Sequence, residues 1–280
     1  MPNQSIIVSL IGAVLFVASS AVAHAASSEW FETTGVKMRL IVQPSETSDE
    51  IVGALDVHLE DGWKTYWRNP GSSGIPLQLD FSQSQNIASA ETDFPTPRLL
   101  PTPSGDVVGY EKHVVFPIRF KLGAQSGSAT PFFSIESSVL IGICADICIP
   151  VQAQFRIDHT QLTSSSFDEL SVLRQGRAAL PKPFHEAQHI VAAEPAEGRR
   201  VLEVITRIPQ TASNTELYAE GPPLWYVPPA KLVSRSGGLA LFELDLGDVP
   251  KDADVTKTSL RFTLVADGQG IEQNFTPAAK

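Results

Sequence analysis

Apolar and polar residues alternate along most of the chain beyond residue 35, as they do in half-buried β-strands. Loops rich in proline, glycine, serine and asparagine separate the alternating runs, among them Asn69–Pro76 and Phe94–Gly109. Many short strands joined by such loops predict a β-sandwich. In the first half of the chain, the pattern predicts strands at Val36–Val42, Ile51–Leu59, Leu77–Phe81, Val114–Leu122, Phe132–Ile143 and Ile147–Ile157.

One segment, Phe167–Ala179, has the spacing of a helix instead, with its apolar residues near helical intervals. Two serines precede Asp168 and Glu169 at its start, which is a capping signal. Pro181 and Pro183 follow its end, where they stop a helix. We interpret residues 161–189 as a helical connector between two domains.

The alternating pattern resumes after the connector, and its density of short strands fits a second, smaller sandwich. The chain is therefore predicted to be all-β, with one sandwich over residues 26–160 and another over residues 190–280. In this second half, the pattern predicts strands at Val201–Ile208, Glu216–Ala219, Lys231–Ser234, Leu239–Leu246 and Ser259–Ala266.

The first 25 residues differ from the rest. Ile6–Val22 is an apolar run rich in small residues, and Ala23-His24-Ala25 supplies a small-x-small cleavage site. Met1–Ser5 contains no lysine or arginine, which departs from the usual pattern. We nevertheless interpret residues 1–25 as a cleavable signal peptide and expect export to the periplasm, where disulfides persist.

Charge and length narrow the possible functions. The 280 residues suit two domains. With 21 Lys+Arg against 31 Asp+Glu, the net charge is −10, which makes nucleic acid a poor partner. No segment after residue 25 has the roughly 20 apolar residues that a transmembrane helix needs.

Cys144 and Cys148 are the only cysteines in the chain. Apolar runs flank both of them, so the three-residue spacer predicts a hairpin loop with the two cysteines facing each other across its mouth. Asp146 lies between them, and no lysine, arginine or histidine occurs within four residues of either. Because a carboxylate disfavours a neighbouring thiolate, the pair fits a relay disulfide that an incoming thiolate attacks.

A purely structural disulfide is the alternative. Closing so short a loop contributes only roughly 2 kcal/mol in the chain-entropy account. A chain long enough for two hydrophobic cores gains little from this, but the spacing alone does not decide between a structural disulfide and a redox-active one.

His185-Glu-Ala-Gln-His189 is a literal H-E-x-x-H, the zinc metalloprotease signature. That chemistry needs a helix, whereas Pro181 and Pro183 lie just upstream and a strand-like run follows. We interpret the segment as a solvated linker and expect no cofactor and no metal.

Three blocks resemble the N-terminal periplasmic domain of DsbD-type protein-disulfide reductases, including the ScsB branch. They are Asp61-Gly-Trp-Lys-Thr-Tyr-Trp-Arg-Asn-Pro-Gly71, Gly109-Tyr-Glu-Lys-His-Val-Val-Phe-Pro-Ile118 and Cys144-Ala-Asp-Ile-Cys148-Ile-Pro150. Their order and rough spacing also match over about Val36–Ile157.

The resemblance implies an immunoglobulin-like thiol–disulfide oxidoreductase domain. It gives Cys148 the mixed disulfide and Cys144 the resolving role, and it places Tyr66 and Asp146 beside the pair. It implies electron transfer from a membrane protein, supplied in trans, to periplasmic thioredoxin-like or disulfide isomerase proteins. The alternative remains a non-catalytic exported adaptor with a structural disulfide.

Two departures from the family pattern concern the site. The longer relatives have five residues between the cysteines, whereas this chain has three. Their cap loop shields the disulfide with a phenylalanine, but Pro101–Val108 contains no aromatic residue. Leu99, Leu100 or Val107 would have to provide the shield.

Overall fold

The computed structural model describes residues 25–45, 49–70, 74–102, 105–123, 132–162, 166–223 and 225–279. The predicted signal peptide, apart from Ala25, lies outside these residues. Within them, no helix is both long and apolar enough to cross a membrane.

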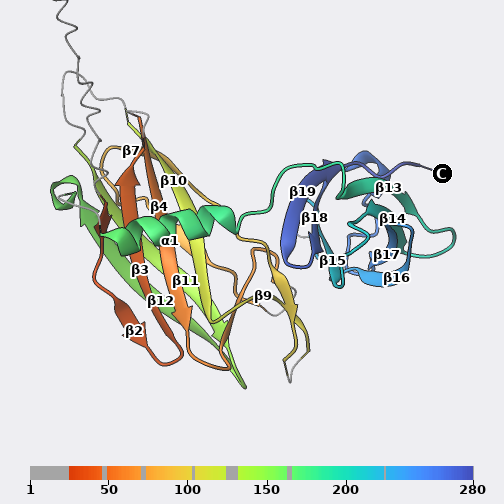
Figure 1. Cartoon of the computed structure of the whole chain (residues 1–280), viewed down its shortest axis with the longest axis horizontal. Coiled ribbons are helices and arrows are strands. Elements are labelled where there is room, and N and C mark those ends of the chain that lie inside the picture. The colour runs from red at the N-terminus through yellow and green to blue at the C-terminus, as the bar shows by residue number, and fades with distance from the viewer. Residues whose placement is uncertain are drawn as a thin grey trace, which may run out of the picture.

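The first sandwich consists of two antiparallel sheets (Figure 1). The first sheet has the strand order β1-β3-β4-β10-β7, with β2 paired to β3. Its strands are β1 (Ala26–Ser27), β2 (Phe31–Thr33), β3 (Val36–Pro44), β4 (Glu50–Leu59), β7 (Ile87–Thr92) and β10 (His113–Leu122).

The second sheet has the order β12-β11-β5-β9-β8, with β6 paired to β11. Alternating apolar residues of the two sheets, such as Phe116 and Ile141, are fully buried between them and form one core. The strands of this sheet are β5 (Lys64–Tyr66), β6 (Gln78–Asp80), β8 (Arg98–Leu100), β9 (Val107–Glu111), β11 (Ser134–Cys144) and β12 (Cys148–Asp158).

Helix α1 (Phe167–Ala178) packs on the outward face of the first sheet. The Ser166 hydroxyl caps its first turn by accepting a hydrogen bond from the Glu169 amide, and the Ser166 amide donates one to the Glu169 carboxylate. Val172 and Leu173 form a small apolar cluster with Ile41, Ala54 and Val115 of the sheet. The predicted helical connector is therefore, over these residues, part of the first sandwich's surface.

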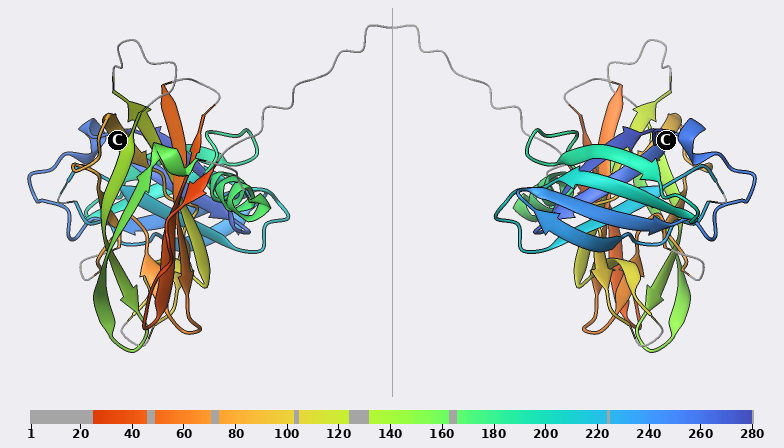
Figure 2. Two further views of the ribbon diagram at one scale, coloured as in Figure 1. Left: turned by 90° about the vertical axis from the view of Figure 1, so that its left-hand side faces the viewer. Right: turned by 90° about the vertical axis from the view of Figure 1, so that its right-hand side faces the viewer.

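The second sandwich has its own core. It packs the sheet β13-β14-β17-β16 against the sheet β15-β18-β19 around Phe242 and Phe262. Its strands run across those of the first sandwich (Figure 2). They are β13 (His189–Pro195), β14 (Val201–Arg207), β15 (Thr215–Glu220), β16 (Lys231–Ser236), β17 (Leu239–Asp245), β18 (Leu260–Ala266) and β19 (Gln269–Phe275). A 3-10 turn at Val255–Lys257 precedes β18, and another at His159–Gln161 follows β12 of the first sandwich.

The two sandwiches contact each other next to β5. Arg68 donates hydrogen bonds to Glu220 and Glu272, at 2.6 Å for the shortest contact to each. Beside it, the rings of Trp67 and Tyr218 lie 5.6 Å apart. These contacts join the segment that follows β5 directly to β15 and β19.

The all-β prediction is confirmed, and each predicted strand is found with its ends shifted by a few residues. The prediction of Phe94–Gly109 as one loop is wrong, because β8 and much of β9 lie within it. Short strands between prolines carry too few residues to show alternation. The sequence pattern also does not predict the short strands β1 and β2 or the strands β7 and β19.

Candidate functional site

The cysteines close the hairpin of β11 and β12. The two strands pair residue by residue from Ser134↔Asp158 to Cys144↔Cys148. Along β11, alternate residues such as Ile141 and Ile143 are fully buried, which fixes the register and brings the cysteines opposite each other. They are disulfide-bonded with Cα atoms 4.0 Å apart, just under the range of about 4.4–6.8 Å that is usual for disulfides. The predicted facing arrangement is confirmed.

The two sulfur-bearing residues differ in exposure. Cys144 is 3% exposed, whereas Cys148 lies on the exposed side of the hairpin. The turn residues Asp146 and Ile147 are also exposed, Ile147 by 68%. Cys148 is therefore the more accessible of the two cysteines. The sequence alone does not single out Ile147, because isolated apolar residues are common on protein surfaces.

Tyr66 contacts the disulfide. Strand β5 pairs with β11 through Ile143↔Thr65, and this brings the Tyr66 hydroxyl to 3.1 Å from Cys148 Sγ. Burial raises the pKa of Tyr66, so the hydroxyl stays protonated at neutral pH and can donate to sulfur. The predicted position of Tyr66 beside the pair agrees with this contact.

Gly142 allows this close approach. A Cβ atom at position 142 would lie 2.6 Å from the Ile75 carbonyl oxygen and 3.1 Å from the Tyr66 ring. Neighbouring Thr65 donates a hydrogen bond to the Gly142 carbonyl oxygen at 2.8 Å. A side chain at this position would clash with Ile75 and crowd the Tyr66 ring, so the glycine favours the close packing of Tyr66 beside the hairpin.

The three residues expected to shield the disulfide differ in their exposure and in what they contact. Leu100 is buried, and Leu99 packs against the first core while its amide donates to Glu216 of the second sandwich at 3.3 Å. Val107 is partly exposed on β9. Residues 103–104 of the cap region lie outside the described residues. Shielding by this region remains a prediction.

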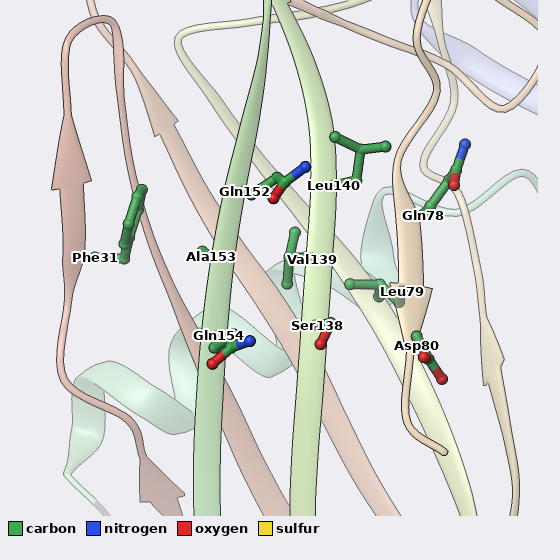
Figure 3. A pocket seen from close by; sticks show the side chains of 10 residues that line it. All are labelled: Phe31, Gln78, Leu79, Asp80, Ser138, Val139, Leu140, Gln152, Ala153 and Gln154. Atoms are coloured by element: carbon green, nitrogen blue, oxygen red, sulfur yellow. The ribbon is translucent and has the colours of Figure 1, made fainter. Parts of the chain in front are cut away.

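A groove of about 700 Å³ lies beside β12 (Figure 3). Phe31 of β2 lies on one side of it and Leu79 of β6 on the other, with Val139 and Gln152 between them. Its lining includes one ionisable side chain, Asp80, and neither cysteine. The groove therefore offers little for exchange chemistry.

The H-E-x-x-H segment forms a turn. His185 pairs with Gln188 in an isolated β-bridge, and His189 already begins β13. Without a helix, the two histidines do not share a helical face as the metalloprotease arrangement requires. Residues 185–187 are exposed, as the interpretation of a solvated linker requires, whereas Gln188 is buried and His189 is part of the second sandwich.

The first sandwich is thus an immunoglobulin-like domain with a disulfide that closes the hairpin of β11 and β12. Residues 36–159 match the family model described as thiol:disulfide interchange protein DsbD, N-terminal. The match covers the sandwich that carries the cysteine pair and supports thiol–disulfide interchange in general.

Most of the chain is also similar to a solved structure. The N-terminal periplasmic domain of ScsB from Proteus mirabilis superposes with a TM-score of 0.75 at 22% sequence identity, covering 90% of this chain and 98% of that one. The comparison with curated proteins gave no significant match.

Proposed function

We propose that the chain is a periplasmic disulfide relay that accepts electrons from a membrane protein and passes them to periplasmic thioredoxin-like proteins. The observation that carries this proposal is the unequal pair: Cys148 is exposed beside the Tyr66 hydroxyl, and Cys144 is buried. The family match of residues 36–159 supports the exchange chemistry. The predicted signal peptide supports the compartment.

The relay consists of two exchange steps. In the first, a thiolate of the reduced donor attacks Cys148 Sγ, the Cys144–Cys148 bond breaks, and Cys144 leaves as a thiolate. The donor's second thiol then attacks the mixed disulfide, which leaves the donor oxidised and both cysteines of this chain reduced. In the second step, the Cys148 thiolate attacks the disulfide of the acceptor. Cys144 then attacks Cys148 Sγ, which restores the internal disulfide and releases the reduced acceptor.

Each site residue has a defined part in this scheme. Cys148 forms the mixed disulfides and Cys144 resolves them. Tyr66 donates a hydrogen bond to Cys148. Asp146 places a negative charge in the turn between the two cysteines. The exposed Ile147 supplies an apolar contact for the docking partner.

Trapping the mixed disulfide tests the proposal. Cys144→Ala lacks the resolving thiol, so it should accumulate a covalent complex with an oxidised thioredoxin-like protein, visible on a non-reducing gel and lost with reductant. Cys148→Ala is the matched control and should trap little, because Cys144 is buried. Both variants should remain folded, since the short loop contributes only roughly 2 kcal/mol. If neither variant traps the partner, or if Cys148→Ala traps it better, the proposal fails.

A further inference from the structure

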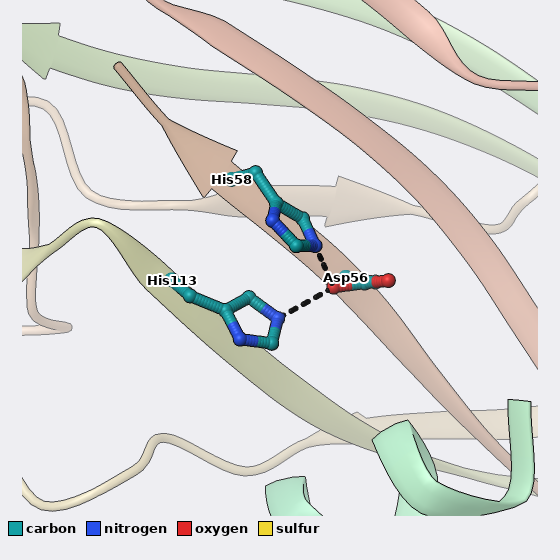
Figure 4. Close-up of side chains that lie close together, drawn as sticks. All are labelled: Asp56, His58 and His113. Atoms are coloured by element: carbon teal, nitrogen blue, oxygen red, sulfur yellow. Dashed lines mark hydrogen bonds and ion pairs between the residues drawn. The ribbon is translucent and has the colours of Figure 1, made fainter. Parts of the chain in front are cut away.

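The outward face of the first sheet carries a polar group that the disulfide site does not use. Alternate residues of a strand share a face, so Asp56 and His58 of β4 lie on the same face as Ala54, which α1 covers. His113 begins β10 and lies directly opposite His58 in the strand register. The three side chains converge (Figure 4).

Both imidazoles point at one carboxylate oxygen. His113 Nε2 lies 2.8 Å and His58 Nε2 3.1 Å from Asp56 Oδ1. The two rings stack with their centroids 4.1 Å apart. Asp56 is 0% exposed, and its other oxygen accepts a hydrogen bond from Arg39 Nε at 3.0 Å. Arg39 also pairs with Asp168 of α1, so the carboxylate is held in place by a residue outside the group.

The spacing of these atoms fits a metal ion. Zinc binds nitrogen and oxygen ligands at about 2.0–2.2 Å, so two ligand atoms at tetrahedral or octahedral angles lie roughly 2.9–3.5 Å apart. The two nitrogen–oxygen distances of 2.8 and 3.1 Å are close to that range. All three ligand atoms lie within 4.8 Å of one another. Binding would require both rings to turn so that their Nε2 lone pairs face the ion rather than Asp56 Oδ1.

We propose that Asp56, His58 and His113 bind one divalent transition-metal ion of the Zn²⁺ class. Imidazole nitrogen and carboxylate oxygen are the ligands that such ions prefer. Arg39 would orient the carboxylate through its second oxygen, as outer partners of metal ligands commonly do. The side chains of His58 and His113 are 37% and 27% exposed, so the ion would enter from solvent and water would complete its coordination.

Neighbouring charges limit the strength of this site. Lys37 and Arg39 both lie over the Trp30 ring, which contacts the His58 ring edge-on at 5.3 Å. Two cations beside the group oppose a bound metal, and Asp168 offsets one of them. We therefore expect weaker binding than at a closed zinc site with four protein ligands.

A zinc titration of the chain from residue 26 onward tests this proposal. The protein carries no affinity tag and has its disulfide closed, because reduced cysteines would supply competing thiolate ligands. Zn²⁺ is the probe because it is redox-inactive and leaves the disulfide unchanged. Competition with a chromophoric chelator should give one Zn²⁺ per chain. Added Zn²⁺ should also raise the midpoint of thermal unfolding.

Two sets of variants locate the ion. His58→Gln and His113→Gln each keep a side-chain donor for Asp56 but remove a ligand, so each should weaken binding about tenfold or more. The double variant His185→Gln/His189→Gln removes the other histidine pair and should bind as the wild type does. The proposal is overturned if the wild type binds no Zn²⁺. It is equally overturned if binding survives in both single variants or is lost in the double variant.

Discussion

The Tyr66 hydroxyl offers a direct way to measure how the fold tunes the cysteine pair. It lies 3.1 Å from Cys148 Sγ, and burial raises its pKa so that it remains a donor in mildly alkaline solution. A hydrogen bond to a thiolate is stronger than one to a disulfide sulfur because the thiolate carries charge. We therefore expect Tyr66 to stabilise the reduced form more than the oxidised form.

Tyr66→Phe removes the hydroxyl and keeps the ring. Hydrogen bonds to charged groups contribute about 1.5–3 kcal/mol, and the exposure of Cys148 favours the lower end. For a two-electron couple, about 1.4 kcal/mol corresponds to 30 mV, so the reduction potential should fall by roughly 30 mV. Equilibration with glutathione at about pH 9, where an ordinary thiol is largely ionised, gives the potential.

Tyr110→Phe is the matched control. Tyr110 is also buried in the first sandwich, but its hydroxyl donates to the Pro95 carbonyl oxygen at 2.8 Å. This control should lose stability and keep its potential. Equal potentials for the wild type and Tyr66→Phe would refute the inferred role of Tyr66, as would an equal shift in the two variants.

Two further predictions concern the architecture. Arg68→Ala removes a partly buried cation that pairs with Glu220 and Glu272. It should lower the free energy of unfolding by about 2 kcal/mol, a value between those typical of surface and of buried ion pairs. Arg68→Ala should also speed proteolysis between Ala179 and Glu197. Arg261→Ala is the control: the Arg261 side chain is half exposed, so this variant should change the stability and the rate of proteolysis little. Ser166→Ala removes the cap of α1 and should lower the free energy of unfolding, measured by urea denaturation, by about 1 kcal/mol. A Ser166→Ala midpoint equal to that of the wild type would show that α1 does not depend on its cap.

The sequence predicts those parts of the fold that depend on local pattern. The hairpin of β11 and β12 follows from long alternating runs on both sides of the cysteine pair. Helix α1 follows from its spacing and its capping signal, although its packing on β4 and β10 does not. Strand β19 carries Gln269, Asn274 and few apolar residues, so its pairing with β18 determines its structure more than its own composition does.

The sites divide in the same way. The cysteine pair is visible in the sequence, and the family resemblance supplies Tyr66 and Asp146. The sequence does not reveal the cluster of Asp56, His58 and His113, because the side chains come together only through the register between β4 and β10. The pairing of Arg68 with Glu220 was likewise hidden, since it depends on how the two sandwiches pack.

The measurement that tests the central claim most directly is a redox titration of the Cys144–Cys148 pair against a glutathione buffer. Thiol alkylation and mass analysis would give the reduced fraction at each potential. A relay should equilibrate in the range of thioredoxin-like proteins, so we expect a midpoint above about −300 mV. A pair that stays fully oxidised below that potential would be a structural disulfide, and the relay account would be wrong.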